Sequence, residues 1–209
     1  RAGATVVPMK PFTTRAIAEG INLFWRVRSW VDISALPQER RNKVLPYIRE
    51  WASIGERVGT AELFHGFSQI AVLRDAAVAA CQPFDFVISP VAPVSTYPAE
   101  WASPTNDPNT TMDHIAFTLP FNMSEQPAIS VPCAHDGAGL PIGLQIIGRR
   151  HDDLGVLRLA RMFEMLRPAD APPHGGFRGY VADPDDHAWE IAWNPVWPIA
   201  DDGRVTFAI

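Results

Sequence analysis

Long apolar runs and basic stripes are both absent from this sequence. No stretch of its 209 residues approaches the run of about eighteen apolar residues that a membrane-spanning helix needs. The formal net charge is −5, and no basic stripe is present that would follow a nucleic-acid backbone. We therefore expect a water-soluble protein whose partners include neither a membrane nor nucleic acid.

Cysteine and lysine are also scarce. Cys81 and Cys133 lie in an apolar helix-like run and at the end of an apolar strand, which is typical of buried free thiols in a reducing compartment. The sequence shows no signal peptide, so we expect the cytoplasm. It begins instead with a strand-like segment at 4–7, as the middle of a domain would. Its lysines are Lys10 and Lys43.

Charge is divided unevenly along the chain. Residues 1–169 hold equal numbers of basic and acidic side chains, whereas the following residues hold two arginines against seven acids. The stretch 170–176 is rich in proline and glycine, which predicts a linker. We therefore divide the chain into a main segment 1–169, a linker 170–176 and a tail 177–209. At 47% hydrophobic residues the chain is able to bury one sizeable core.

Helical periodicity covers much of the main segment. Apolar residues recur at helical spacing over 14–31, over 39–55 with a break at Pro46, and over 60–81 with Thr60 as the N-cap. At Pro46 the pattern is compatible with two short helices or with one kinked helix. The 60–81 helix is expected to bury a face made of Phe64, Phe67, Ile70, Ala71 and Val78.

Short apolar segments rich in β-branched residues predict the strands, and these are 4–7, 85–89, 128–133 and 142–147. The polar, proline-containing stretch 97–111 predicts a loop. A last helix that ends before Pro168 is expected to bury Leu154, Leu157, Ala160, Phe163 and Leu166. Together these elements predict an α/β fold in which helices cover a mixed sheet.

The strand at 142–147 carries a candidate binding feature. Alternation places Gly143 and Gln145 on one face and Leu144 and Ile146 on the other. A glycine and an amide on one face of a buried strand indicate the close approach of a ligand or of neighbouring backbone. Simple packing against another segment is the alternative.

Three motifs together resemble the C-terminal region of the amidase signature hydrolases. They are FDFVISPVAPV at 84–94, NMSEQPAISVP at 122–132 and GLPIGLQIIG at 139–148. The resemblance covers residues 1–169. It implies part of that family's α/β fold and, for the whole enzyme, hydrolysis of a carboxylic amide without a cofactor.

The family's catalytic residues have no counterparts here. The resemblance implies a serine nucleophile activated by a second serine, on a cis peptide bond, and by a buried lysine. This sequence has no Ser-Ser pair, and neither lysine stands in a context like that of the catalytic lysine. We expect those residues upstream of residue 1, with no catalytic residue in this chain. A small-molecule amide would bind once an N-terminal segment or partner chain completes the site.

Within the resemblance, Phe121 and Asn122 would lie beside the substrate. Asn122 is able both to donate and to accept hydrogen bonds, and the alternative is that it holds its loop together. Many family members carry glycine where Glu125 stands, so the backbone at this position is of interest. The residue types of a Cys-His-Asp hydrolase are also present, since Cys133 is accompanied by His135 and, upstream, by Asp113 and His114.

The tail predicts a β-hairpin. GFRGYVADPDDHAWEIAWNP reads as two alternating strands joined by a tight turn at 183–186. It resembles the last hairpin of the vicinal oxygen chelate (glyoxalase-like) superfamily, which implies Glu190 as a metal ligand. Asp186 replaces that family's glycine, and further ligands would have to come from strands that this chain lacks. A hairpin left by gene fusion is the alternative.

Three functional classes therefore remain open. The first is a part of an amide hydrolase that an N-terminal partner completes. The second is a non-catalytic remnant or interaction protein, and the third is a metal-dependent module built through Glu190. Exposed apolar surface would also allow the chain to form oligomers.

Overall fold

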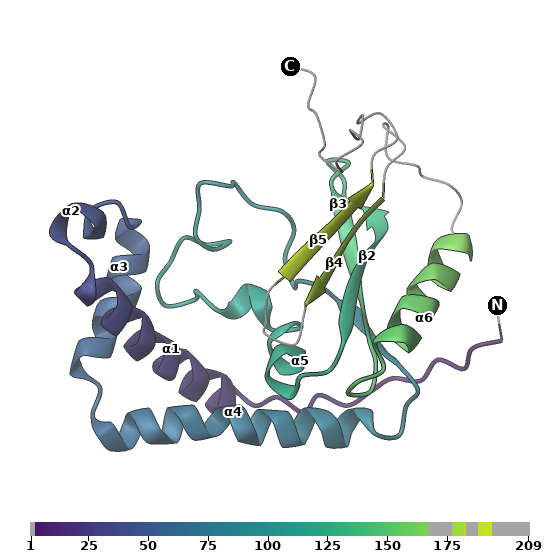
Figure 1. Cartoon of the computed structure of the whole chain (residues 1–209), viewed down its shortest axis with the longest axis horizontal. Helices are drawn as coiled ribbons and strands as arrows, with labels where there is room; N and C mark the ends of the chain where they lie inside the picture. The colour runs from purple at the N-terminus through teal and green to yellow at the C-terminus, as the bar shows by residue number, and fades with distance from the viewer. Residues whose placement is uncertain (1–2, 167–176, 183–187, 194–209) are drawn as a thin grey trace, which may run out of the picture.

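A computed structural model describes residues 3–166, 177–182 and 188–193 of the chain, the last two ranges by their backbone alone. Its architecture is a small sheet flanked by helices (Figure 1). The helices are α1 (Arg15–Ala35), α2 (Gln38–Arg41), α3 (Pro46–Ser53), α4 (Thr60–Cys81), α5 (Leu119–Ser124) and α6 (Asp153–Leu166), with 3₁₀ turns η1 (Ile54–Arg57) and η2 (Asp113–Ile115). The strands are β1 (Val87–Pro90), β2 (Ala128–His135), β3 (Pro141–Ile147), β4 (Phe177–Ala182) and β5 (Ala188–Trp193).

The main sheet has three strands in the order β1-β3-β2. Helices and strands occur together, which confirms the α/β class. Both strand pairings are antiparallel, so the expectation of a mixed sheet is wrong for the described strands. The predicted strand at 4–7 is also wrong. This segment has no strand beside it in the described structure, and Val6 is 76% exposed, so neither a hydrogen-bond ladder nor burial holds it in the sheet.

Helix α6 covers one face of the sheet. Ile129 and Ile146 pack there against Val156 and Ala160 of the helix. The helix begins where the Asp152 carboxylate accepts a hydrogen bond from the Gly155 amide at 3.0 Å. Of the predicted face, Ala160 and Phe163 do pack on the sheet. The predicted leucines are exposed because the contact centres on Val156 instead; they are Leu154, Leu157 and Leu166.

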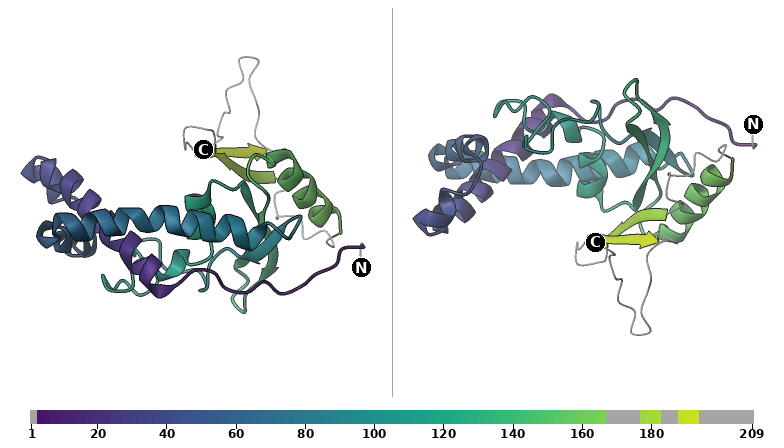
Figure 2. Two further views of the ribbon diagram at one scale, coloured as in Figure 1. Left: turned by 90° about the horizontal axis from the view of Figure 1, so that it is seen from below. Right: turned by 90° about the horizontal axis from the view of Figure 1, so that it is seen from above.

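The opposite face of the sheet lies against the C-terminal half of α4 and against α5. Val87 and Ile147 form a core cluster there with Cys81 and Phe121. Figure 2 shows α4 running from α1, α2 and α3 at one end of the molecule to the sheet at the other. Burial raises the pKa of the Cys81 thiol, which keeps it protonated and unreactive.

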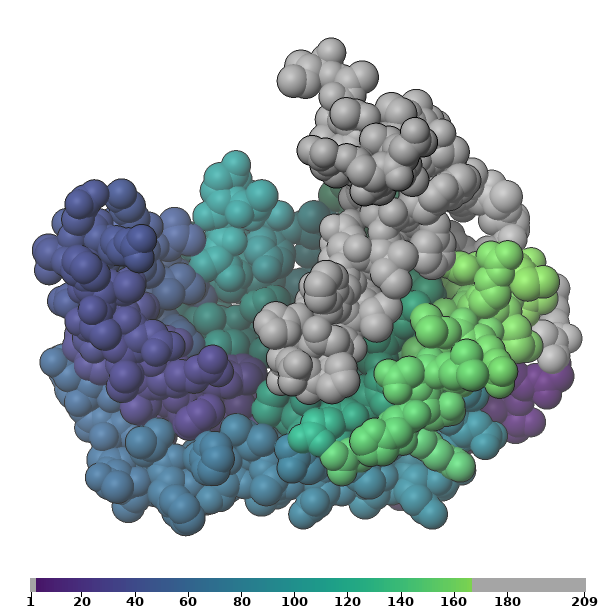
Figure 3. All heavy atoms as spheres, viewed as in Figure 1, coloured from purple at the N-terminus to yellow at the C-terminus, as the bar shows by residue number. Residues whose placement is uncertain are grey.

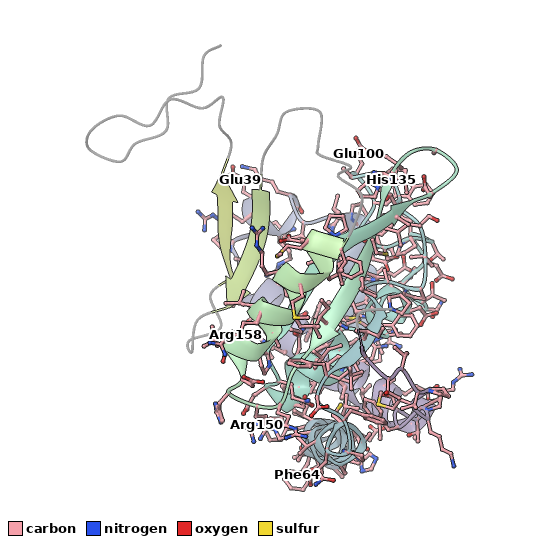
Figure 4. The ribbon with its side chains drawn as sticks, turned by 90° about the vertical axis from the view of Figure 1, so that its right-hand side faces the viewer. Glu39, Phe64, Glu100, His135, Arg150 and Arg158 are labelled. Atoms are coloured by element: carbon pink, nitrogen blue, oxygen red, sulfur yellow. The ribbon has the colours of Figure 1, made fainter. Side chains whose placement is uncertain are left out.

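Helix α4 has the predicted extent, but of its predicted buried face only Ile70 packs against a core cluster. Phe64 is 72% exposed and Phe67 is 54% exposed, while Leu73 and Ala77 are fully buried. The reason is a close crossing with α1, where a Cβ on Gly66 would lie 2.6 Å from the Gly20 carbonyl oxygen. Only a small-residue face allows this approach, so the aromatic stripe is left largely exposed. Phe64 points outward (Figure 4), and Phe67 lies at the margin against the Phe24 ring of α1, at a centroid distance of 5.3 Å.

Helices α1 to α3 and η1 form a projecting unit, which we call the helical arm. Pro46 starts α3, so the pattern over 39–55 is resolved as separate short helices. The core of the arm contains Ile33, Trp51 and Ala52. The described residues include no helix that is both long enough and apolar enough to cross a membrane.

Strands β4 and β5 are described by their backbone. They pair antiparallel, with Tyr180 opposite Glu190. The turn at 183–186 and the linker at 170–176 lie outside the described residues, as do the side chains of both strands. The hairpin, the domain division and the role of Glu190 therefore stay predictions.

Candidate functional site

A row of polar side chains crosses the face of the sheet against which Phe121 of α5 packs. Antiparallel register places Ser89 of β1 and Ser130 of β2 on either side of Gln145 in β3. Gln145 is only 5% exposed, so its amide needs hydrogen-bond partners inside the protein. This row is the candidate site, because it contains Gln145, which the sequence indicated, and lies on the face that packs against α5.

The Gln145 amide is held by its own chain. Its Nε2 donates to Ser89 Oγ at 3.0 Å and to the Phe117 carbonyl at 2.9 Å, which uses both of its hydrogens. Phe117 ends the long connection between β1 and α5. Gln145 thus fixes this connection to the middle strand of the sheet.

Gly143 meets the start of the same connection. A Cβ on Gly143 would lie 2.7 Å from Val91 Cγ2 and 3.0 Å from Ser130 Oγ, so a larger residue does not fit without a shift. Gly143 and Gln145 share a face, as alternation predicted, and the close approach comes here from neighbouring segments of the chain. Their contact with a substrate stays a prediction.

The structure separates the two α5 residues. Phe121 is 5% exposed and packs edge-on against Phe12 at a centroid distance of 6.3 Å, as a core residue does. Asn122 is exposed, and its side chain makes no hydrogen bond within the described residues. Asn122 therefore does not hold its loop together and is free to meet a ligand, which stays a prediction.

The loop after α5 is held by residues that the sequence reasoning missed. Ser124 Oγ donates to Gln126 Oε1 at 2.9 Å, and Gln126 Nε2 donates to the Gly148 carbonyl at 2.9 Å. Both side chains are buried. Ser89 and Ser130 were missed too, although alternation within ISP and AISVP was the signal that could have found them.

Glu125 adopts the left-handed conformation, with φ 58° and ψ 31°. This conformation explains why glycine suits the position, since a Cβ costs about 1–2 kcal/mol there. The Glu125 carboxylate pairs with Arg74 at 2.6 Å and also with Arg150. Both ion pairs are partly exposed, so each contributes little to stability.

Other chemistries find little support in the described part of the chain. Cys133 makes no hydrogen bond there to either histidine, and His114 packs edge-on against Tyr97 at 6.1 Å. No group of three or more histidine, cysteine, aspartate or glutamate side chains is placed to hold a metal among these residues. The side chain of Glu190 is not among the described ones, so its role as a metal ligand stays a prediction.

Comparison with known proteins defines the class. A family model described as Amidase matches residues 5–157. The chain therefore belongs to the amidase family. The matched range ends before the tail, so the glyoxalase-like resemblance of residues 177–209 stays a prediction.

Particular relatives include an acylamidase and one component of an amidotransferase. The Acylamidase of Rhodococcus erythropolis is 33% identical over 147 residues, covering 65% of this chain and 30% of that protein. A subunit of the Glutamyl-tRNA(Gln) amidotransferase of Myxococcus xanthus is 39% identical over 93 residues, which cover 44% of this chain and 19% of that protein. The chain thus spans less than a third of the length of these relatives.

Solved structures share the fold. The crystal structure of an amidase superposes with a TM-score of 0.61 at 22% identity, covering 72% of this chain and 35% of that chain. The 6-aminohexanoate cyclic dimer hydrolase gives a TM-score of 0.59 at 20% identity, covering 74% and 36%. At these identities the likeness concerns the fold alone.

Proposed function

We propose that this chain is the C-terminal portion of an amidase that hydrolyses the C–N bond of a carboxylic amide. In this proposal the serine nucleophile, the second serine and the lysine lie in polypeptide upstream of residue 1. Family membership and the relatives named above support amide hydrolysis. The sequence itself contains no Ser-Ser pair that could supply the catalytic serines.

The open edge of β1 is the observation that carries the proposal. Among the described strands, β1 has β3 on one side and no strand on the other. Helix α6 packs on β2 and β3, and Ile88 of β1 is 51% exposed. A strand with unpaired backbone groups and an exposed apolar side chain is suited to pair with further polypeptide. We assign that place to the upstream part of the amidase.

The chemistry divides between the two parts. The upstream serine would attack the amide carbonyl carbon while the second serine and the lysine take up its proton. That proton passes to the leaving amine, and water then hydrolyses the acyl-enzyme to the acid. In this proposal the present chain supplies the sheet face with its polar row, and the exposed Asn122 side chain would hydrogen-bond the bound amide.

Amide hydrolysis by reconstitution tests this proposal. The purified chain and the chain co-expressed with the polypeptide encoded immediately upstream are assayed for ammonia release from simple amides. We expect no turnover by the chain alone and serine-type hydrolysis by the pair. The Asn122→Ala pair should have a raised KM. Robust hydrolysis by the chain alone, or none by the pair, would overturn the proposal.

A further inference from the structure

The connection between β1 and α5 leaves and rejoins the sheet at almost the same place. At its start, the Val91 amide donates to the Gly143 carbonyl at 3.1 Å. At its end, the Phe117 carbonyl accepts from Gln145 at 2.9 Å. The two anchors are two residues apart on β3. The connection, residues 91–117, is therefore a closed loop with both ends fixed on the candidate site.

The far end of this connection reaches the helical arm. Tyr47 of α3 places its hydroxyl 2.6 Å from Thr111 Oγ1, 2.9 Å from Ser103 Oγ and 3.1 Å from the Asp107 carbonyl oxygen. Tyr47 is 8% exposed, Thr111 6% and Ser103 0%. Figure 3 shows the connection, in teal, rising between the arm and the rest of the molecule.

These hydroxyl groups satisfy one another. Thr111 Oγ1 donates to the Pro108 carbonyl at 3.0 Å, which leaves it to accept the hydrogen of the Tyr47 hydroxyl. Ser103 Oγ lies 2.9 Å from the same Tyr47 hydroxyl, within hydrogen-bond distance. Because Tyr47, Ser103 and Thr111 are all buried, the hydrogen bonds among their hydroxyl groups are stronger than exposed ones.

Arg26 of α1 ties the same network to a second helix. Its Nη2 donates to the Pro108 carbonyl at 3.1 Å, and its guanidinium lies 5.9 Å from the ring centroid of Trp51. The side chain is 8% exposed and forms no ion pair within the described residues. The Pro108 carbonyl thus accepts hydrogen bonds from both Arg26 and Thr111. We call Tyr47, Arg26, Ser103, Pro108 and Thr111 the Tyr47 clamp.

Between the anchors on β3 and the clamp lies a stretch with little to hold it. Residues 92–97 neither donate nor accept a backbone hydrogen bond within the described structure. Val94 is 45% exposed. Motion of the connection would therefore concentrate in 92–97 and would be limited by the clamp.

We propose that Tyr47 and Arg26 are positioning residues whose clamp fixes the 91–117 connection to the helical arm. Residues 92–97 are the hinge of this unit. That the positioned connection borders an amide substrate rests on the proposed function. The clamp itself does not, and it is measurable without any activity.

Hydrogen exchange in the full chain tests the clamp through Tyr47→Phe, which keeps the ring and removes the hydroxyl. The amides of Asn106 and Thr110, which bond Ser103 and Asp107 within the connection, should exchange about tenfold faster, as expected for the loss of one hydrogen bond. Amides of β2 and β3 should exchange as before. The matched control is Tyr97→Phe, since the Tyr97 hydroxyl has no hydrogen bond among the described residues, and it should change nothing.

A second pair of variants separates the hydroxyl from the fold. Thr111→Val should speed exchange of the same amides, and Thr111→Ser, which restores the hydroxyl, should return it to the original rate. Chymotrypsin should cut after Trp101 faster in Tyr47→Phe than in the unsubstituted protein. Trypsin would not report on the connection, because residues 91–148 contain no lysine or arginine. Equal exchange in Tyr47→Phe and Tyr97→Phe, a Ser variant no better than Val, or equal acceleration in β2 and β3 would each overturn the clamp.

Discussion

The helical arm and the sheet are held together by different means. In the sheet, adjacent strands in register bring apolar side chains to each face, and one buried amide, Gln145, ties down a loop. At the arm, α1 crosses α4 where glycine removes the side chain, and the buried network of the Tyr47 clamp joins α3 to the 91–117 connection. The sheet therefore follows a pattern that can be read along the chain, whereas the arm depends on contacts between distant residues.

The largest expected effect compares the two faces of α4. Leu73→Ala should lower the free energy of unfolding by about 2–5 kcal/mol, because Leu73 is fully buried among apolar neighbours. Phe64→Ala should change it by no more than about 0.5 kcal/mol, because this side chain is largely exposed. Urea denaturation of both variants measures the difference. A larger loss for Phe64→Ala would show that the aromatic stripe is the buried face after all.

The helix crossing gives the next effect. Gly66→Ala should lower the free energy of unfolding by about 1–3 kcal/mol, because the new methyl group would meet the Gly20 backbone. This loss should exceed the gain in helix propensity of up to about 1 kcal/mol. Gly137→Ala is the control, since no atom lies within 4 Å of the added Cβ. A stabilised Gly66→Ala protein would contradict the close crossing.

For the sheet, the variant that removes the key buried contact is Gln145→Met. It should cost about 1–3 kcal/mol, because the Phe117 carbonyl and Ser89 lose a buried donor. Gln38→Met at the exposed start of α2 should cost no more than about 0.5 kcal/mol. Thermal or urea unfolding measures both. Equal losses would mean that the amide does not hold the connection.

The smallest effect concerns the left-handed residue Glu125. Glu125→Ala should be about 1 kcal/mol less stable than Glu125→Gly, because glycine adopts this conformation without strain. Both variants lose the ion pairs to Arg74 and Arg150, so the comparison isolates the backbone. Urea unfolding of the two variants decides it. Equal stability would place the residue outside the left-handed region.

Much of the fold follows from the sequence because local pattern determines it. The extent of α4, the strands at β1, β2 and β3, and the shared face of Gly143 and Gln145 agree with periodicity. Alternation succeeds in a strand because every second residue faces the same way whatever lies opposite. A helix offers several faces for burial. In α4 the close crossing at Gly66 buries a face of small residues, which hydrophobicity alone does not favour.

The remainder depends on distant contacts. Strand direction is not written in a hydrophobic pattern, so an antiparallel sheet was taken for a mixed one. Segment 4–7 has the composition of a strand without a neighbour to pair with in the described structure. At the candidate site, the partners of Gln145 come from residues 28 and 56 positions away, which sequence spacing does not reveal.

The most direct test of the account is amide exchange along β1, in the chain alone and together with the polypeptide encoded upstream. We predict that the backbone amides of Val87 to Ser89 that β3 leaves unpaired become protected when the upstream polypeptide is present, and that Ile88 is then shielded from solvent. Unchanged exchange along β1 in a mixture that hydrolyses amides would contradict the assignment of this edge to the rest of the amidase.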